Sequence, residues 1–315
     1  MHSTGNPPIA HPRVALETYR GLRAGTVVVI LLIAVAQIDE YRVTGDVAQS
    51  ISGSFYTSVH AVFVGALFAT GTCLIIYRGN SDREDSVLNF AGFMAFFVAV
   101  VPTQPMRICA TANPADTGFT ALPGCQDYDR VLSTGLAALV TVWIVAELGY
   151  FGFVWRTRGF VAYTTPLRFI RLAISALLVV YFCAPVGLND VLHLPWGEQF
   201  LDNRHNVAAI LMFLGIIAVV GLNGWSARTL GLRSNAFRYL VIGVVMIVTV
   251  ILVAAFHLWN EQWFPGWKFQ HDLLVLEWAL ILEFAAFWII QSIELWNVDR
   301  RDALPEAELK QTVPE

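Results

Sequence analysis

The chain has 315 residues, 56% of them hydrophobic and 14% charged, with a formal net charge of −4 at pH 7. This composition excludes an ordinary soluble globular domain, in which about a quarter of the residues are charged. The arginines sit in short segments between apolar runs and form no basic stripe, so nucleic acid is not an expected partner. The composition predicts an all-α polytopic membrane helix bundle whose main partner is the lipid bilayer.

Eight apolar runs follow one another along the chain, each close to the ~20 residues that a helix needs to cross ~30 Å of hydrocarbon. Helices are expected because a lipid-exposed backbone must satisfy its own hydrogen bonds, and the runs lack the alternation of a β-barrel. The predicted spans lie near residues 24–38, 57–77, 86–103, 131–155, 167–184, 206–225, 237–258 and 273–296.

The basic residues of the connecting segments predict the orientation of these eight transmembrane helices. Fifteen lie on the side of the N-terminal tail, and five, namely Arg42, Arg107, Arg130, Arg204 and Lys268, lie on the other. Because Lys and Arg are enriched in cytoplasmic loops, both termini are expected in the cytoplasm of a cell whose inner membrane holds the chain. The expected parts are a cytoplasmic tail at 1–23, a transmembrane domain at 24–298 and a second cytoplasmic tail at 299–315.

The first run also allows a second interpretation. It ends in Ala34-Val35-Ala36, a small-x-small pattern that a signal peptidase could cut. The 23-residue polar lead and the charges that directly follow the run equally suit a membrane anchor. The remaining seven helices keep their orientation under either interpretation.

The four cysteines fit this topology. Cys109 and Cys125 lie in the long third loop, which the charge count places outside the cytoplasm, where oxidation occurs. A disulfide between them would restrain a Gly, Pro and Thr-rich loop, and two unpaired thiols are the alternative. Cys73 and Cys183 fall within predicted helices, where packing in the core is the expected role.

Five of the seven histidines are expected on or near the outer face, and four of them lie at helix ends. Such a layer could bind a metal ion, ligate haem or respond to external pH, because imidazole is a good ligand that titrates near neutrality. The alternative is an interfacial belt, since several tryptophans surround these positions. No HxxxH, HExxH or CxxC spacing supports a metal motif. The four candidates are His60, His205, His257 and His271.

Several glutamates fall inside the predicted helices, where an ionised side chain costs ~3 kcal/mol or more. Glu283 lies near the middle of the last helix and Glu147 in the fourth. Asp272, Glu283 and Glu294 recur every eleven residues, about three turns, so they share one helix face, whereas Glu277 lies on another. Glu283, Glu147 and Glu277 are the candidate proton or cation site. The structural alternative is that Glu147 pairs with Arg171 and that Glu283 is protonated or hydrogen-bonded to a neighbouring helix.

Two helix pairs suggest an internal repeat. The stretches that begin at His60 and His205 share Val at the third, Phe at the ninth and Gly at the twentieth position. The stretch around Glu147 also resembles the one around Glu283 once one residue is inserted. Two four-helix halves, 24–155 and 167–298, would be parallel repeats about an axis along the membrane normal. Chance similarity between apolar runs is the alternative.

Small residues also mark a predicted packing ridge. Ala61, Gly65 and Ala69 recur every four residues in the second helix, a spacing typical of close helix packing.

The stretch "SISGSFYT", followed by "FVGALFATGTCLIIYRG" and "EDSVLNFAGFMAFFVAVVPT", resembles a stretch of bacterial polytopic membrane proteins without an assigned activity. That family is distantly similar to the Frag1/DRAM/Sfk1 group. The resemblance covers residues 50–103. It implies a polytopic membrane protein and does not specify any chemistry.

Three functions remain open from the sequence. The leading hypothesis is a non-enzymatic protein that binds a lipid, a small ligand or a partner protein at a polar outer vestibule. The second is a proton-coupled secondary transporter that uses Glu283 and Glu147. The third is a membrane enzyme that holds metal or haem on the outer histidines. The sequence does not indicate the oligomeric state.

Overall fold

The computed structural model describes residues 12–46, 50–103, 128–158, 166–183, 197–263, 272–298 and 301. These residues are all helical or irregular, without a strand, so the predicted all-α class is confirmed for them. Each predicted apolar run corresponds to one α-helix. The elements are α1 (Pro12–Thr44), the short 3-10 helix η1 (Ser52–Tyr56), α2 (His60–Ile76), α3 (Asp82–Val100), α5 (Tyr128–Arg158), α7 (Pro166–Cys183), α9 (Gly197–Thr229), α10 (Arg233–Trp263) and α11 (Asp272–Glu294).

The first helix is longer than the sequence predicted. The predicted run covers 24–38, whereas α1 extends over 33 residues and passes without a break through Ala36. Its polar first turns are helical because they contain no helix breaker after Pro12, and proline is favoured at a helix start. Tyr19 and Leu22 in these turns pack against the core, so the polar lead is part of the bundle.

Five of the described helices are long and apolar enough to cross a membrane, namely those over 14–44, 132–153, 204–229, 233–252 and 273–294. α2 is apolar but shorter, and α3 begins with four charged residues that follow Ser81. Many large apolar side chains lie exposed on the surface, for example Val142, Leu177 and Leu252. An apolar exterior of this kind suits lipid rather than water, so the chain is a multi-pass membrane protein.

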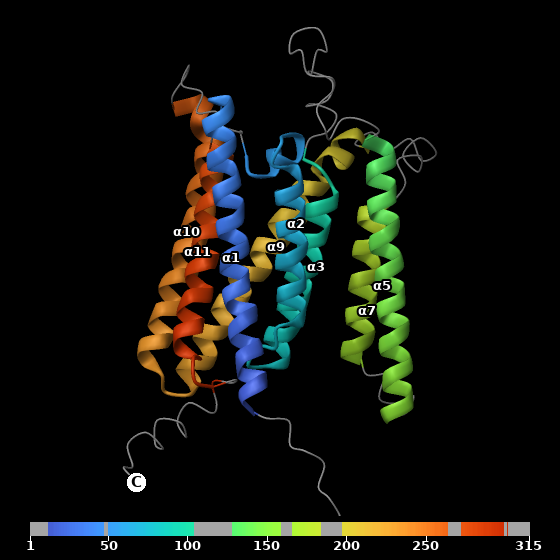
Figure 1. Ribbon diagram of the computed structural model, residues 1–315, viewed down its shortest axis with the longest axis vertical. Coiled ribbons are helices and arrows are strands. Elements are labelled where there is room, and N and C mark those ends of the chain that lie inside the picture. Colours follow the sequence, from blue (N-terminus) through green and yellow to red (C-terminus); the bar gives the residue numbers. More distant parts are fainter. Residues whose placement is uncertain are drawn as a thin grey trace, which may run out of the picture.

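Six helices form a closed ring. In it α1 contacts α2, α2 contacts α3, α3 contacts α9, α9 contacts α10, α10 contacts α11, and α11 returns to α1. The pair α5 and α7 lies to one side, where α5 packs on α3 (Figure 1). We call the end at which α1 begins and α11 ends the basal end, and the opposite end the apical end (Figure 1).

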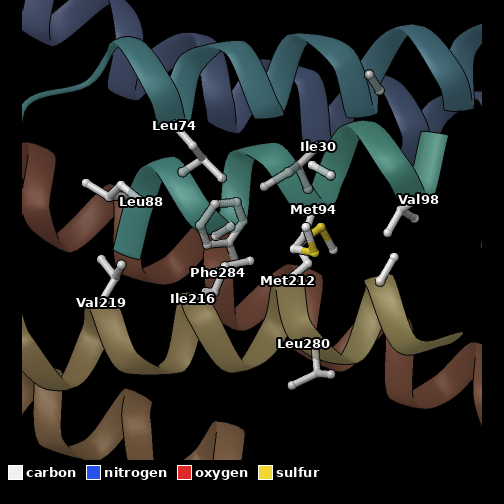
Figure 2. Close-up of a cluster of buried hydrophobic side chains, with 14 of the residues drawn as sticks. Ile30, Leu74, Leu88, Met94, Val98, Met212, Ile216, Val219, Leu280 and Phe284 are labelled. Carbon is white, nitrogen blue, oxygen red and sulfur yellow. The ribbon is translucent and has the colours of Figure 1, made fainter. Parts of the chain in front are cut away.

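The inside of the ring is filled with apolar side chains from most of its helices. Leu74, Leu88 and Met94 of α2 and α3 meet Ile216 of α9 and Phe284 of α11, all of them at most 5% exposed (Figure 2). Well-packed apolar cores contain few voids large enough for water. In the described part, an apolar core occupies the middle of the ring.

Helices α2 and α3 approach each other closely at two glycines. A Cβ atom added to Gly71 would lie 2.7 Å from the carbonyl oxygen of Gly92, and one added to Gly92 would lie 2.6 Å from that of Gly71. The packing ridge predicted at Ala61, Gly65 and Ala69 was wrong: Ala61 and Gly65 are exposed, and no atom of the described residues lies within 4 Å of a Cβ placed at Gly65. Spacing alone does not tell which face of a helix meets a neighbour.

Candidate functional site

A short serine-rich segment outside the α-helices is folded into the apical end of the ring and is held there by Glu277. This segment, Ser50–Tyr56, is almost wholly buried and includes η1. The backbone N–H groups of Ile51 and Ser52 donate to one carboxylate oxygen of Glu277, and the Ser52 hydroxyl donates to the other at 2.8 Å. Hydrogen bonds to a carboxylate are stronger than those between neutral groups, so Glu277 fixes the segment on α11.

Two further interactions attach the segment to other elements. The Gln37 side-chain amide of α1 donates to the Ser54 hydroxyl. The Tyr56 hydroxyl donates to the carbonyl oxygen of Thr103 at 2.8 Å, beyond the end of α3. We call the segment Ser50–Tyr56 together with Glu277 and Gln37 the apical platform. Because α1, α11 and the end of α3 all hold it, its conformation is fixed by the ring.

The histidines of the predicted outer layer are partly described. Nδ1 of His60 lies 2.5 Å from the Phe55 carbonyl oxygen, and Nδ1 of His205 lies 2.5 Å from that of Val101. In each ring Nδ1–H is therefore the donor, which is the orientation that a metal-binding histidine also has. The side chains of His257 and His271 lie outside the described part, so convergence of the four stays a prediction. Among the described residues no three His, Cys, Asp or Glu side chains are grouped as a metal site.

The basal end contains a larger polar cluster that begins at the start of α3. Ser81 caps this helix, since its hydroxyl accepts the N–H of Glu84 at 3.2 Å. The Glu84 side chain turns back and accepts the N–H of Asn80, the residue before the N-cap, at 2.8 Å, which is a variant of the capping box. Its second oxygen accepts from the Asn223 amide of α9 at 2.8 Å, which ties α3 to α9.

Arg301 enters this cluster from beyond α11 and connects four parts of the ring. Its Nε and Nη2 donate to the two carboxylate oxygens of Glu294, at 2.8 and 2.9 Å, and Nη2 also donates to Asn223 Oδ1 at 2.8 Å. Its backbone N–H donates to Asn80 Oδ1 at 2.9 Å, and Tyr239 of α10 donates its hydroxyl to Glu294. Burial alone would lower the pKa of Arg301, but the hydrogen bond and charge of Glu294 outweigh it and raise that pKa.

We call these residues the basal cluster: Asn80, Glu84, Asn223, Tyr239, Gln291, Glu294 and Arg301. Sequence reasoning did not identify it, although two signals were present. The Ser81-x-x-Glu84 pattern is a capping box, and Asn223 and Gln291 are amides inside apolar runs. Gln291 donates to Asn223 Oδ1 at 2.9 Å, so both amides face the same cluster.

Two arginines of α1 stabilise the end of α11. Arg20 Nε donates to the Trp296 carbonyl oxygen at 2.7 Å, and its guanidinium lies 4.6 Å from the centre of the Trp296 ring. Arg23, which is wholly buried, donates to the Leu295 carbonyl oxygen at 3.2 Å. Positive groups at a helix C-terminus satisfy its last carbonyl groups and its dipole.

The three predicted site glutamates do not form one site. Glu283 accepts the Thr249 hydroxyl of α10 at 2.7 Å, so the alternative of a hydrogen bond to a neighbouring helix is confirmed. Glu294 faces α10 as well, whereas Glu277 binds the segment beside α1 and α2, as their spacing predicted. Glu147 lies on α5, which packs on α3 and α7. Because α5 lies outside the ring that contains α11, a shared site of Glu147 with Glu283 and Glu277 stays a prediction.

The predicted disulfide between Cys109 and Cys125 lies outside the described residues. Cys73 is a free thiol in α2.

Comparisons with models of protein families, with curated proteins and with solved structures find no match to this chain.

Proposed function

We propose that the chain is a non-enzymatic membrane protein that binds a lipid, a small ligand or a partner protein at its apical platform. The observation that carries this proposal is the attachment of Ser50–Tyr56 to Glu277. A buried carboxylate in a membrane helix is costly, and here its hydrogen bonds hold the buried segment Ser50–Tyr56 in one conformation. A site built around a segment that is already fixed loses little entropy when a ligand binds, which favours a role in recognition.

At the apical end, α1 extends beyond the level of the platform. α1 continues past the platform contact at Gln37 to Thr44, and Tyr41 and Val43 in this extension are 52% and 78% exposed. The Ser58 hydroxyl donates to Glu40 and fixes the extension beside the platform. An exposed aromatic and aliphatic strip next to a rigid polar segment suits a ligand with both apolar and polar groups.

We propose the following orientation for this site. All eight helices cross the inner membrane, the basal end lies in the cytoplasm and the apical platform lies outside. The distribution of arginines supports this, since Arg78, Arg156, Arg228 and Arg233 lie at basal helix ends and Arg42 at an apical one. The parallel repeat of 24–155 and 167–298, and the similarity of residues 50–103 to the Frag1/DRAM/Sfk1 group, remain part of this proposal.

The experiment that tests the function is native mass spectrometry of the purified protein after exposure to a lipid and metabolite extract of the expressing cells. We expect a retained species that the Glu277→Gln variant loses, because the amide cannot accept all three hydrogen bonds. Glu283→Gln is the matched control, since it makes the same chemical change on the same helix away from the platform. Equal retention by all three proteins would refute the apical site.

A second candidate function is proton-coupled transport, which one observation favours. Glu283 lies at the middle of α11, and its Oε2 is buried without a hydrogen-bond partner among the described residues, while Oε1 accepts from Thr249. Ionisable groups at this depth often serve proton transfer. In proteoliposomes, uptake driven by a pH gradient and abolished by Glu283→Gln but not by Glu277→Gln would establish transport in place of apical binding.

A further inference from the structure

The turn between α9 and α10 at the basal end carries exposed arginines without any acidic residue near them in the chain. Arg228 ends α9, and Arg233 and Arg238 lie in the first turns of α10. All three are exposed. Residues 203–260 contain no Asp or Glu, so the whole hairpin is positively charged.

Two of these arginines lie on one tight turn. Gly231 adopts φ +78°, which glycine does without strain, and the Leu232 N–H donates to the Ala227 carbonyl oxygen at 2.9 Å. The tight turn links Arg228, at the end of one helix, to Arg233, at the start of the next, through two backbone hydrogen bonds at Gly231. Two like charges on one short turn repel each other, and an anion bound there would relieve this repulsion.

Two exposed aromatic side chains lie next to Arg228 and Arg233 in the sequence, one helical turn further from the basal end. Trp225 precedes Arg228 by three residues and Phe237 follows Arg233 by four, so each lies about one helical turn, ~5 Å, further along the helix axis. Trp225 is 71% exposed and Phe237 is 65% exposed. Cationic groups at the rim with aromatic rings one turn deeper match the headgroup and the upper acyl region of a phospholipid.

The α2–α3 turn, the other described turn at the basal end, does not share this excess of positive charge. Between α2 and α3, Arg78 pairs with Asp85 at 2.9 Å, and Asp82 and Glu84 add two more negative charges. The carboxylate that meets α10, Glu294, is wholly buried and paired with Arg301. The positive charge of the α9–α10 turn is therefore not neutralised by the described part of the protein.

We propose that the α9–α10 turn binds the phosphate headgroup of an anionic phospholipid, with Arg228 and Arg233 on the phosphate and Trp225 and Phe237 beside the glycerol and acyl chains. Arginine suits this role because its planar guanidinium donates two parallel hydrogen bonds to phosphate oxygens. Basic pockets between transmembrane helices bind anionic lipid headgroups by the same chemistry.

The test measures how much phosphatidylglycerol and phosphatidylcholine the intact protein retains in native mass spectrometry at equal lipid concentrations. The wild type is expected to prefer phosphatidylglycerol. The double variant Arg228→Gln/Arg233→Gln should lose this preference by about 25-fold, at roughly fivefold for each basic residue near an anionic surface. Arg78→Gln/Arg83→Gln is the matched control at the neighbouring turn and should keep the preference.

A third variant separates the two parts of the site. Trp225→Ala should weaken retention of both lipids alike, because the ring contacts parts that the two lipids share. All these positions are exposed, so the variants should fold as the wild type does. Equal retention of the two lipids by the wild type, an unchanged preference in the Arg228/Arg233 variant, or a response to inorganic phosphate in place of the lipid would overturn the proposal.

Discussion

Replacement of Arg301 by glutamine should strongly destabilise the basal end of the ring. Arg301 lies outside the helices, yet its side chain and that of Glu294 are both 0% exposed. The guanidinium donates to both oxygens of Glu294 and to Asn223, and so connects α9 with α11. Tyr239 of α10 donates to the same carboxylate. The substitution therefore affects three helices at once.

The magnitude follows from the burial of the pair. Removing one partner of a buried ion pair leaves the other charge uncompensated and costs about 3–5 kcal/mol. Glutamine retains one amide donor, so the lower end, about 3 kcal/mol, is expected for Arg301→Gln. Arg78 forms a pair with Asp85 of the same length, 2.9 Å, but its side chain is 71% exposed. Arg78→Gln should therefore cost less than about 1 kcal/mol.

Thermal unfolding in detergent micelles, followed by tryptophan fluorescence, measures both variants against the wild type. The two substitutions make the same chemical change at the same end of the protein and differ in the burial and in the number of hydrogen bonds of the replaced arginine. A clearly lower melting temperature is expected for Arg301→Gln and an unchanged one for Arg78→Gln. Equal melting temperatures for the two variants would show that Arg301 does not hold the basal cluster together.

Three further predictions concern stability in the same unfolding assay. Asn223→Ala should cost about 1–3 kcal/mol, because Glu84 loses a donor and Arg301 and Gln291 lose an acceptor. Combined with Arg301→Gln it should cost less than the sum of the two, and strict additivity would contradict a shared network. Glu277→Gln should cost about 1–3 kcal/mol and Glu283→Gln less than about 1 kcal/mol, since Glu283 accepts a single hydrogen bond; the reverse order would refute the role of the platform. Gly92→Ala should cost about 1–3 kcal/mol by forcing α2 from α3, whereas Gly65→Ala should be neutral or stabilising by up to about 1 kcal/mol.

The positions of the helices, and the faces on which their glutamates lie, could be predicted from the sequence because both depend on local chemistry. Runs of about 20 apolar residues can only be helices in lipid, so the position of each helix follows from composition. The eleven-residue spacing of Glu283 and Glu294 placed both on the face that meets α10, and put Glu277 on another face. Helical periodicity determines these relations within one helix without any knowledge of its neighbours.

Relations between helices were not predictable in the same way. Glu147 and Glu283 looked equivalent in the sequence, yet α5 packs beside the ring and α11 within it. Arg301 belongs to a segment predicted as a cytoplasmic tail, and a single arginine there carries no pattern that reveals its burial. Similarly, Gly65 and Gly71 are alike in sequence, and only the position of α3 decides which of them is a contact.

Hydrogen exchange of the full chain in lipid nanodiscs, with and without the ligand retained in native mass spectrometry, tests the central claim most directly. The account predicts that the ligand slows exchange of the backbone amides of Ser50–Tyr56, and that Glu277→Gln abolishes this protection. Protection confined to the helices around Glu283 and Thr249, with none in Ser50–Tyr56, would contradict an apical binding site.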